Sequence, residues 1–389
     1  MPARDGTIHQ PFRSCTIDQN AAGDLLYEDA AAQDKRRVIV DQRAISSFYY
    51  VYMMAPATFK FVFIAFMSVC GGLAAQSTEV LAFWNVENLF DTIDDPHTDD
   101  EEFTPSGRNK WTAGRYYKKL ERLSEVIALL GTTDSPQGAA VVGLCEVEND
   151  AVLDDLVAML RSRNKNYSYV HRDGPDQRGI DVAMLYDAGR FRPDSIQSIR
   201  VDLPNGHPTR DILVVSGELD REDVVFIVSH WPSRRGGEKN TRPLRRSAAH
   251  AIKRITDSVF KMYPSKSVVV MGDLNDDPGG HTARLLTIPV TDSALKQPVL
   301  FNCMEALFRQ GIGTLAWNDR WNLFDQVLLS SHFLDEQGWR LTKTLVHNEN
   351  KLKNASGRYA GYPFRTFAAG VYYGGYSDHF PVYVVLQRL

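Results

Sequence analysis

Short runs of β-branched and other apolar residues recur along the chain from about residue 79 onward, and they predict a protein rich in buried strands. The strongest of these runs predict strands at 79–86, 140–147, 180–187, 211–218, 224–230, 267–273, 324–330 and 381–387. Apolar residues at helical spacing predict helices at 114–131, 150–161 and 243–262. Pro243 would then lie in the first turn of the last helix, where a proline is tolerated.

Many strands with few, widely spaced helices argue against a strict alternation of strand and helix. They predict an α+β fold in which two sheets pack face to face and the helices lie outside. The chain has 389 residues, of which 43% are hydrophobic and 24% charged, an ordinary globular composition. No internal repeat of solenoid length is visible. We therefore expect one domain over residues 76–389.

The N-terminal part follows a different pattern. Residues 1–52 have mixed polarity without a clear period, and we expect a disordered extension or an over-extended translation. Residues 53–75 contain Lys60, a short apolar core and small residues at the end, which together are typical of a secretory signal peptide cleaved near Ala75. This predicts a secreted, periplasmic or cell-envelope protein. An uncleaved anchor, or a lipid on Cys70 that would bring the protein to a membrane, is the alternative.

Cysteine content and charge exclude some classes of protein. After such a cleavage only Cys145 and Cys303 would remain, too few for a disulfide framework, and we assign neither a catalytic role. Cys145 is expected in the packed face of its strand. The net charge of −4 does not fit a general nucleic-acid coat protein, although it is compatible with local phosphate binding.

Polar residues stand at the ends of several strand-like runs. In "VVVMGDLNDDP" the run ends in Asp273 and Asn275, which would point to the same side and could hold a hydrated divalent cation or a phosphate oxygen. Other such residues occur in "FWNVENLF", "VVGLCEVEND", "VVFIVSHWPS", "RWNLFDQVLLS" and "YSDHFPVYVVL", namely Asn85, Glu146, His230, Asp325, Asp378 and His379. A sandwich of two sheets can bring these strand ends together at one edge.

This ordered set of motifs, over about residues 79–389, resembles the endonuclease/exonuclease/phosphatase superfamily. "GDLN" and "SDHFPV" are the most specific of them. The resemblance implies a DNase I-like fold, a four-layer α/β sandwich of two mostly antiparallel sheets. It also implies divalent-metal-dependent hydrolysis of phosphate esters.

The resemblance implies a role for each residue of the set. Glu146 is the main metal-binding carboxylate, with Asn85 beside it and Asp378 as a second ligand. Such oxygen ligands suit Mg²⁺ or Mn²⁺. Asp273 orients or deprotonates the attacking water, and Asn275 donates to a phosphate oxygen.

Two histidines complete the expected chemistry. His379 is paired with a carboxylate, here Asp325, which would fix its tautomer and raise its pKa; either Asp273 or His379 could be the base. His230 would protonate the leaving group or bind the phosphate. Asp181 is a candidate carboxylate partner of His230 at the substrate side, although it could instead pair with Arg178.

Three segments bear on the substrate. The segment after His230 has a local charge of +5, and Arg234 and Arg235 are expected to contact a polyanion. An aromatic, glycine-rich loop that includes Tyr376 could stack on bases or could be core, and Trp317 and Trp321 pose the same alternative. The acidic run over residues 94–102 is expected to be a solvated loop rather than a structural Ca²⁺ site.

We therefore predict a secreted, metal-dependent phosphodiesterase acting on nucleic acid, with no stable protein partner implied. The alternatives are a phosphomonoesterase for sugar or inositol phosphates and a sphingomyelinase-type phospholipid hydrolase. A non-catalytic binding protein of the same fold is disfavoured, because Glu146, Asp273, His230 and His379 are all present.

Overall fold

The computed structural model describes residues 77–288, 297–335 and 338–388. The expected extension, signal peptide and Cys70 lie outside the described residues. The fold below is that of the unit Ala75–Leu389.

Two six-stranded sheets form this unit. The first has the order β13 (Arg340–Val346), β16 (Val382–Arg388), β1 (Ser77–Leu89), β2 (Val141–Val147), β4 (Asp181–Asp187) and β3 (Tyr167–His171). The second has the order β5 (Phe191–Ile199), β6 (Ile212–Leu219), β7 (Glu222–His230), β8 (Ser267–Asp273), β12 (Asp325–Ser330) and β9 (Leu300–Asn302). Neighbouring strands run antiparallel except for the pairs β1–β2 and β7–β8, which are parallel. Every strand predicted from the sequence is present.

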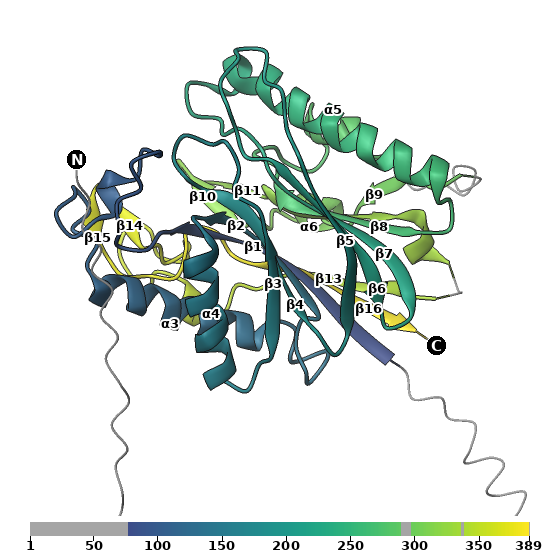
Figure 1. The fold of residues 1–389 in the computed structure, drawn as a ribbon, viewed down its shortest axis with the longest axis horizontal. Helices are drawn as coiled ribbons and strands as arrows, with labels where there is room; N and C mark the ends of the chain where they lie inside the picture. The colour runs from purple at the N-terminus through teal and green to yellow at the C-terminus, as the bar shows by residue number, and fades with distance from the viewer. Residues whose placement is uncertain (1–76, 289–296, 336–337, 389) are drawn as a thin grey trace, which may run out of the picture. The chain divides into compact units, whose positions relative to one another are not determined.

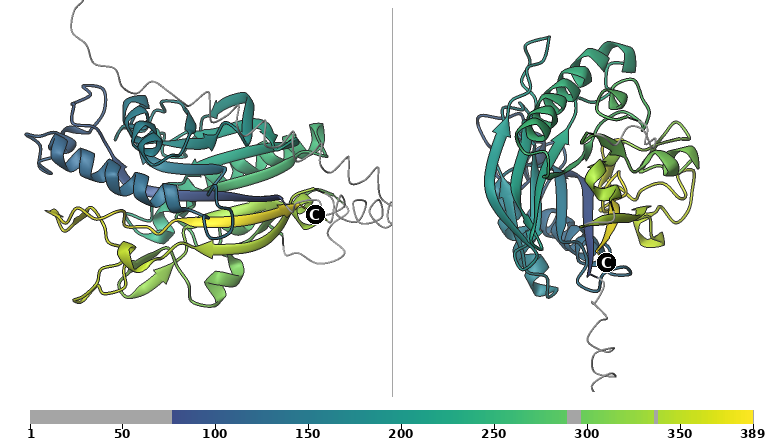
Figure 2. Two further views of the ribbon diagram at one scale, coloured as in Figure 1. Left: turned by 90° about the horizontal axis from the view of Figure 1, so that it is seen from below. Right: turned by 90° about the vertical axis from the view of Figure 1, so that its right-hand side faces the viewer.

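The helices lie on the outer faces of the two sheets (Figures 1 and 2). Helices α3 (Ala113–Leu129) and α4 (Asp150–Ser162) pack with Trp84 and Leu144 on the first sheet, and α5 (Glu238–Met262) packs with Val270 on the second. The inner faces meet in a separate core that contains Phe83 and Phe226. The predicted four-layer α/β sandwich is confirmed.

Shorter elements complete the unit. They are the hairpins β10 (Leu315–Trp317) with β11 (Arg320–Asn322) and β14 (Phe367–Ala368) with β15 (Val371–Tyr372), the helix α6 (Glu305–Arg309), and the 3₁₀ turns η1 (Glu101–Phe103), η2 (Ala283–Leu285), η3 (Ser331–Leu334) and η4 (Asn350–Leu352).

One helix boundary differs from the prediction. Helix α5 begins at Glu238, after Gly237 with φ of 103°, so Pro243 lies inside the helix and not in its first turn. A proline there cannot donate to the carbonyl of Lys239. Lys239 is exposed, so water can solvate that carbonyl at little cost.

The two sheets approach each other closely. A Cβ atom on Gly143 would lie 2.5 Å from Sδ of Met271, so a larger residue would push the sheets apart. Cys145 lies in the core between the sheets, as expected, and burial raises the pKa of its thiol well above the usual value. Cys145 and Cys303 are both free thiols.

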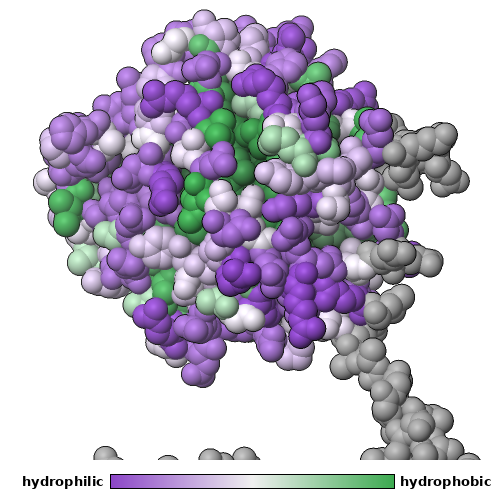
Figure 3. Space-filling view, turned by 45° about the vertical axis from the view of Figure 1, so that its right-hand side comes forward, coloured by the Kyte–Doolittle hydropathy of each residue, from purple (hydrophilic) through white to green (hydrophobic). Residues whose placement is uncertain are grey.

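The surface is mainly polar on the face that Figure 3 shows, where hydrophobic side chains gather near the centre. Within the described ranges, no helix is sufficiently long and apolar to pass through a bilayer.

Candidate active site

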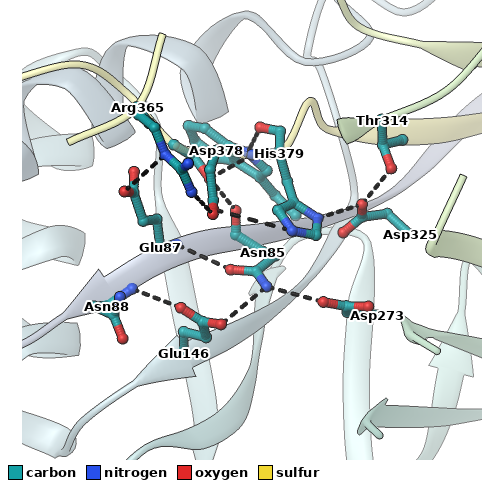
Figure 4. A network of polar contacts seen from close by, with 12 residues as sticks. Asn85, Glu87, Asn88, Glu146, Asp273, Thr314, Asp325, Arg365, Asp378 and His379 are labelled. Carbon is teal, nitrogen blue, oxygen red and sulfur yellow. Dashed lines mark hydrogen bonds and ion pairs between the residues drawn. The ribbon is translucent and has the colours of Figure 1, made fainter. Parts of the chain in front are cut away.

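Strand ends from both sheets meet at one edge of the sandwich. The parallel pairs β1–β2 and β7–β8 end there, and β12 and β16 begin there because they run antiparallel to their neighbours. This arrangement brings six polar residues of the sequence motifs into one network (Figure 4), namely Asn85, Glu146, Asp273, Asp325, Asp378 and His379.

Asn85 connects the two sheets across this edge. Its Nδ2 lies 3.2 Å from Oε1 of Glu146 on the first sheet and 3.1 Å from Oδ2 of Asp273 on the second. Its Oδ1 accepts the Glu87 N–H at 2.9 Å. Asn85 therefore lies beside Glu146, as expected, and positions the two carboxylates through its amide NH₂.

Glu146 projects from an irregular point of β2. The pairing register with β4 shifts between Cys145 and Val147, and Glu146 has φ of 64°. A non-glycine residue rarely adopts this left-handed conformation, which occurs at bulges and functional sites. Oε2 of Glu146 accepts the N–H of Asn88 at 3.0 Å, and the side chain is half-buried. The bulge thus holds the carboxylate at the edge of the sheet.

His379 and Asp325 form the predicted pair. Nδ1 of His379 lies 2.6 Å from Oδ2 of Asp325, which also accepts the hydroxyl of Thr314. Asp273 faces Asp325 across β8 and β12, and ligand atoms of Asp273, Asp325 and His379 lie within 4.8 Å of one another. Burial opposes protonation of His379, but the charge and hydrogen bond of Asp325 and the charges of Asp378 and Asp273 together outweigh it and hold the histidine pKa well above its usual value.

Asp273 is buried among charged groups. Burial, together with the charge of Asp325, raises the pKa of this carboxyl to about 7, although His379 pulls it in the opposite direction. Asp273 can therefore exchange a proton near neutral pH.

Asp378 is paired with a residue that the sequence analysis did not single out. The guanidinium of Arg365 forms an ion pair with Asp378, and its Nε lies 3.8 Å from Oε1 of Glu87. Glu87 is buried, accepts the N–H of Thr366 at 2.6 Å, and has a pKa raised by burial to about 7. Arg365 belongs to the aromatic, glycine-rich loop, which we had considered only for its aromatic residues.

His230 lies near Asp273 but not near its expected partner. Its Nε2 is 3.6 Å from Oδ2 of Asp273, and burial, with Arg210 and Arg178 adding to it, holds its pKa well below the usual value. The pairing of Asp181 with His230 was wrong, because Asp181 lies 3.7 Å from Nε2 of His171 instead.

The pairing of Asp181 with Arg178 was wrong as well. Nε of Arg178 contacts Oδ1 of Asp176 at 3.3 Å, and Asp176 also pairs with Arg210 at 2.9 Å. The other guanidinium nitrogen of Arg210 donates to the carbonyl of Trp231 at 2.8 Å. A buried arginine thus holds the residue that follows His230.

Asn275 sits in a tight turn with φ of 46°. Its backbone N–H donates to Oδ1 of Asp273 at 2.9 Å, and its Nδ2 donates to the carbonyl of Trp231 at 3.0 Å. Nε of Arg234 donates to the carbonyl of Asn275 at 2.9 Å, and the guanidinium pairs with Asp276 at 2.8 Å. Arg234 therefore holds this turn in place.

The basic segment after His230 is a loop only as far as Gly237, because its second half belongs to α5, which begins at Glu238. Arg245 is fully buried and donates to Oγ1 of Thr241 at 2.8 Å, and Arg242 pairs with Glu238 at 2.7 Å. Arg235 is exposed and stays free to meet a polyanion.

The aromatic residues divide into buried and exposed sets. Tyr376 is only 6% exposed and packs in the outer core of the first sheet, with Arg122 stacked 4.6 Å above its ring. Of the two alternatives for this residue, the structure therefore supports a place in the core over contact with substrate. Trp317 and Trp321, by contrast, are 70% and 37% exposed. They lie on the hairpin β10–β11, whose turn residues Asn318 and Asp319 both have positive φ.

The site contains more carboxylates than cations. The site is lined by five carboxylates and two cationic side chains, namely Glu87, Glu146, Asp273, Asp325 and Asp378 with Arg365 and His379. Oxygen ligands in this number fit a hard divalent cation, with Glu146 and Asp378 as the residues that would hold it. Among the described residues, two clusters of side chains lie close enough to share one metal ion: one is Asp273, Asp325 and His379, and the other is His171, Asp173 and Asp181. The acidic run over residues 94–102 contributes no residue to either cluster.

Several solved structures are similar to this chain at low sequence identity. Zebrafish TDP2, in a form humanized by 14 mutations, superposes with a TM-score of 0.50 at 15% identity and covers 79% of this chain and 98% of its own. An endonuclease/exonuclease/phosphatase family protein from Bacteroides thetaiotaomicron has a TM-score of 0.49 at 13% identity and covers 81% and 96%. The human Nocturnin catalytic domain has a TM-score of 0.49 at 13% identity and covers 80% and 97%.

No curated protein sequence matches this chain. The sequence profile described as "Endonuclease/Exonuclease/phosphatase family" matches residues 80–388, which is almost all of the described unit. The chain belongs to the endonuclease/exonuclease/phosphatase family of phosphoester hydrolases.

Proposed function

We propose that this protein is a divalent-metal-dependent phosphodiesterase that cleaves nucleic acid. The observation that carries the choice of substrate is an exposed aromatic surface beside His379. We call it the aromatic ledge, and it consists of the exposed Trp317, Trp321 and Tyr359 together with the half-buried Tyr362. Trp321 stacks on Phe380, the residue that follows His379, with ring centroids 6.1 Å apart.

The aromatic ledge suits a chain of bases better than a small phosphate ester. Exposed aromatic rings stack on unpaired bases without regard to sequence, while a neighbouring polar site handles the backbone phosphate. Arg235, exposed after His230, adds a positive charge that a polyanion would contact. A phosphomonoester would need neither feature.

The roles of the residues follow from their protonation. His379 is held as an imidazolium by Asp325, so it stabilises negative charge on the scissile phosphate and does not act as a base. Asp273, with a pKa raised to about 7, takes the proton from the attacking water. His230 is neutral and can donate one hydrogen bond to a phosphate or leaving-group oxygen.

The cation is the remaining component. Glu146 and Asp378 would hold Mg²⁺ or Mn²⁺, and the ion would neutralise charge on the phosphate oxygens. Asn85 keeps Glu146 and Asp273 at a fixed separation, and Arg365 keeps Asp378 beside the site.

We also propose that the protein acts outside the cytoplasm. The support is the charged, apolar and small-residue order of residues 53–75, which is typical of a signal peptide. Cell fractionation followed by N-terminal sequencing tests this: we expect protein outside the cytoplasm that lacks residues 53–75, and protein found only in the cytoplasm with these residues attached would overturn the proposal.

A substrate panel tests the proposed activity. Purified protein with Mg²⁺ or Mn²⁺ is given single-stranded DNA, RNA, bis-p-nitrophenyl phosphate, inositol and sugar phosphates, and sphingomyelin. We expect cleavage of the nucleic acids and of the small diester. Activity confined to monoesters would replace the proposal with a phosphatase, and activity confined to sphingomyelin would assign the aromatic ledge to a lipid surface.

A further inference from the structure

A second cluster of metal-binding side chains lies at the outer strands of the first sheet. His171 ends β3, Asp181 begins β4, and Asp173 lies in the connection between them. Ligand atoms of the three residues lie within 4.8 Å of one another. None of them belongs to the network of Figure 4.

The imidazole of His171 has a defined orientation. Its Nδ1 lies 3.0 Å from Oδ1 of Asp150, the first residue of α4, and the histidine side chain is only 1% exposed. A carboxylate accepts hydrogen bonds, so this contact places a proton on Nδ1. Nε2 then carries either a second proton or, in the neutral ring, a free lone pair.

That lone pair faces another acceptor. Nε2 is buried without a hydrogen-bond partner among the described residues, and the nearest charged atom is Oδ2 of Asp181 at 3.7 Å. The same carboxylate accepts the N–H of Gly174 at 3.0 Å, which keeps it pointing toward the ring. The Nε2 lone pair of His171 and the carboxylate of Asp181 repel each other when they are held face to face. A cation between these two acceptors would remove the repulsion.

Charge supports the same conclusion. Asp150 and Asp173 approach Nδ1 of the imidazole, at 3.0 and 3.9 Å, and Asp181 approaches Nε2 at 3.7 Å. Within the described ranges, none of these carboxylates has a lysine or arginine within 4.0 Å. Asp173 is exposed, so the cluster is open to solvent on one side. An ion could therefore enter without unfolding the sheet.

We propose that His171, Asp173 and Asp181 bind a divalent transition-metal ion such as Zn²⁺, at a site separate from the catalytic carboxylates. An imidazole with carboxylates suits zinc, whereas the oxygen ligands around Glu146 suit magnesium. Asp150 acts on the site through the histidine, because it fixes the ring and its tautomer as carboxylates do for metal-bound histidines.

The site would stabilise the loop over residues 172–180. This loop carries Asp176 and Arg178, and Asp176 pairs with Arg210, which holds the carbonyl of Trp231 next to His230. Metal binding at His171 would thus order a segment that supports the active site.

Titration calorimetry with Zn²⁺ tests this on tag-free protein in excess Mg²⁺, so that the catalytic carboxylates are occupied. We expect the wild-type chain to bind one Zn²⁺ and His171→Gln to bind none. The control His379→Gln alters the other cluster of metal-binding side chains, and it should still bind one Zn²⁺. Asp150→Asn should weaken binding by about 10- to 100-fold. Loss of binding in His379→Gln with retention in His171→Gln would overturn the proposal.

A second measurement covers the case in which His171→Gln fails to fold. Asp173→Asn changes an exposed side chain, and we expect it to weaken Zn²⁺ binding with an unchanged circular dichroism spectrum. Nitrogen NMR of His171 in the wild-type protein should show a metal-bound Nε2. An imidazolium signal that Zn²⁺ leaves unchanged would instead assign the cluster to an ion pair.

Discussion

Nδ1 of His379 lies 2.6 Å from Oδ2 of Asp325, and the two residues come from different sheets. Asp325 is fully buried at the start of β12, and His379 precedes β16. The pair therefore forms only when both sheets are packed against each other. The protonation of His379 in the site thus depends on the correct packing of the two sheets. Three other features of the unit also have measurable consequences: the aromatic ledge, the adjacent Arg234 and Arg235, and the buried Glu79.

Asp325→Asn should impair catalysis more than substrate binding. The amide cannot hold His379 as an imidazolium, so kcat should fall by about 10²- to 10⁴-fold while KM changes little. Steady-state kinetics on bis-p-nitrophenyl phosphate measure this. Thr314→Val removes only the hydroxyl bonded to Asp325 and should cost less. A kcat of Asp325→Asn close to that of Thr314→Val would contradict the assigned role.

Trp317→Ala should weaken the binding of single-stranded DNA. The lost stacking is worth about 1–3 kcal/mol per base, and turnover of bis-p-nitrophenyl phosphate should not change. Fluorescence anisotropy in a Glu146→Gln background measures binding without cleavage. Tyr263→Ala, which removes an exposed aromatic side chain just after α5, is the control and should have no effect. If Trp317→Ala and Tyr263→Ala bound single-stranded DNA with equal affinity, the aromatic ledge would not be part of the substrate site.

Arg234 and Arg235 should behave differently although they are adjacent. Arg235→Ala should weaken DNA binding and reduce the salt slope by about 1, with small diesters unaffected, because this side chain is exposed. Arg234→Ala should lower activity on DNA and on bis-p-nitrophenyl phosphate alike, because Arg234 holds the turn of Asn275. Identical profiles for the two variants would contradict this division.

Glu79 should make the folded state less stable as the pH rises. Burial outweighs the attraction of Arg190, 2.9 Å away, and raises the carboxyl pKa to about 7. Because the pKa is raised, the folded state binds more protons than the unfolded state, so this contribution is present below the unfolded pKa of 4.5 and is lost as the pH rises to about 7.

Urea unfolding at pH 5 and pH 8 measures this effect. At about 1.4 kcal/mol per pKa unit, the wild type should lose on the order of 1–3 kcal/mol over this range through Glu79. Glu79→Gln should show a smaller loss. A steeper dependence in Glu79→Gln would show that the sign is wrong.

The strands and the active-site edge could be predicted because each depends on local sequence. Runs such as Val268–Met271 are short, continuous, apolar and rich in β-branched residues, which favours a buried strand, and the residue after each run lies at the strand end whatever the topology. The contact of His379 with Asp325 was predicted from the family resemblance and is confirmed.

Other features depend on contacts between distant segments. Asp181 was assigned to His230 by alternation along its own strand, but His171 on the neighbouring strand is the residue it faces. Tyr376 was grouped with exposed aromatics, yet it is buried against α3 through Arg122. Arg365 and Glu87 meet although they are far apart in sequence, and although Glu87 lies within "FWNVENLF", nothing in that motif indicates its contact with Arg365.

Mg²⁺-dependent cleavage of a labelled single-stranded oligonucleotide, compared between wild type and Glu146→Gln, tests the central claim most directly. We predict cleavage by the wild type that stops on chelation and returns with added Mg²⁺. We also predict that Glu146→Gln, folded to the same melting temperature, is at least about 10³-fold slower, as expected when the main metal-binding carboxylate is lost. Cleavage by Glu146→Gln at the wild-type rate, or wild-type cleavage that persists after chelation, would contradict the account.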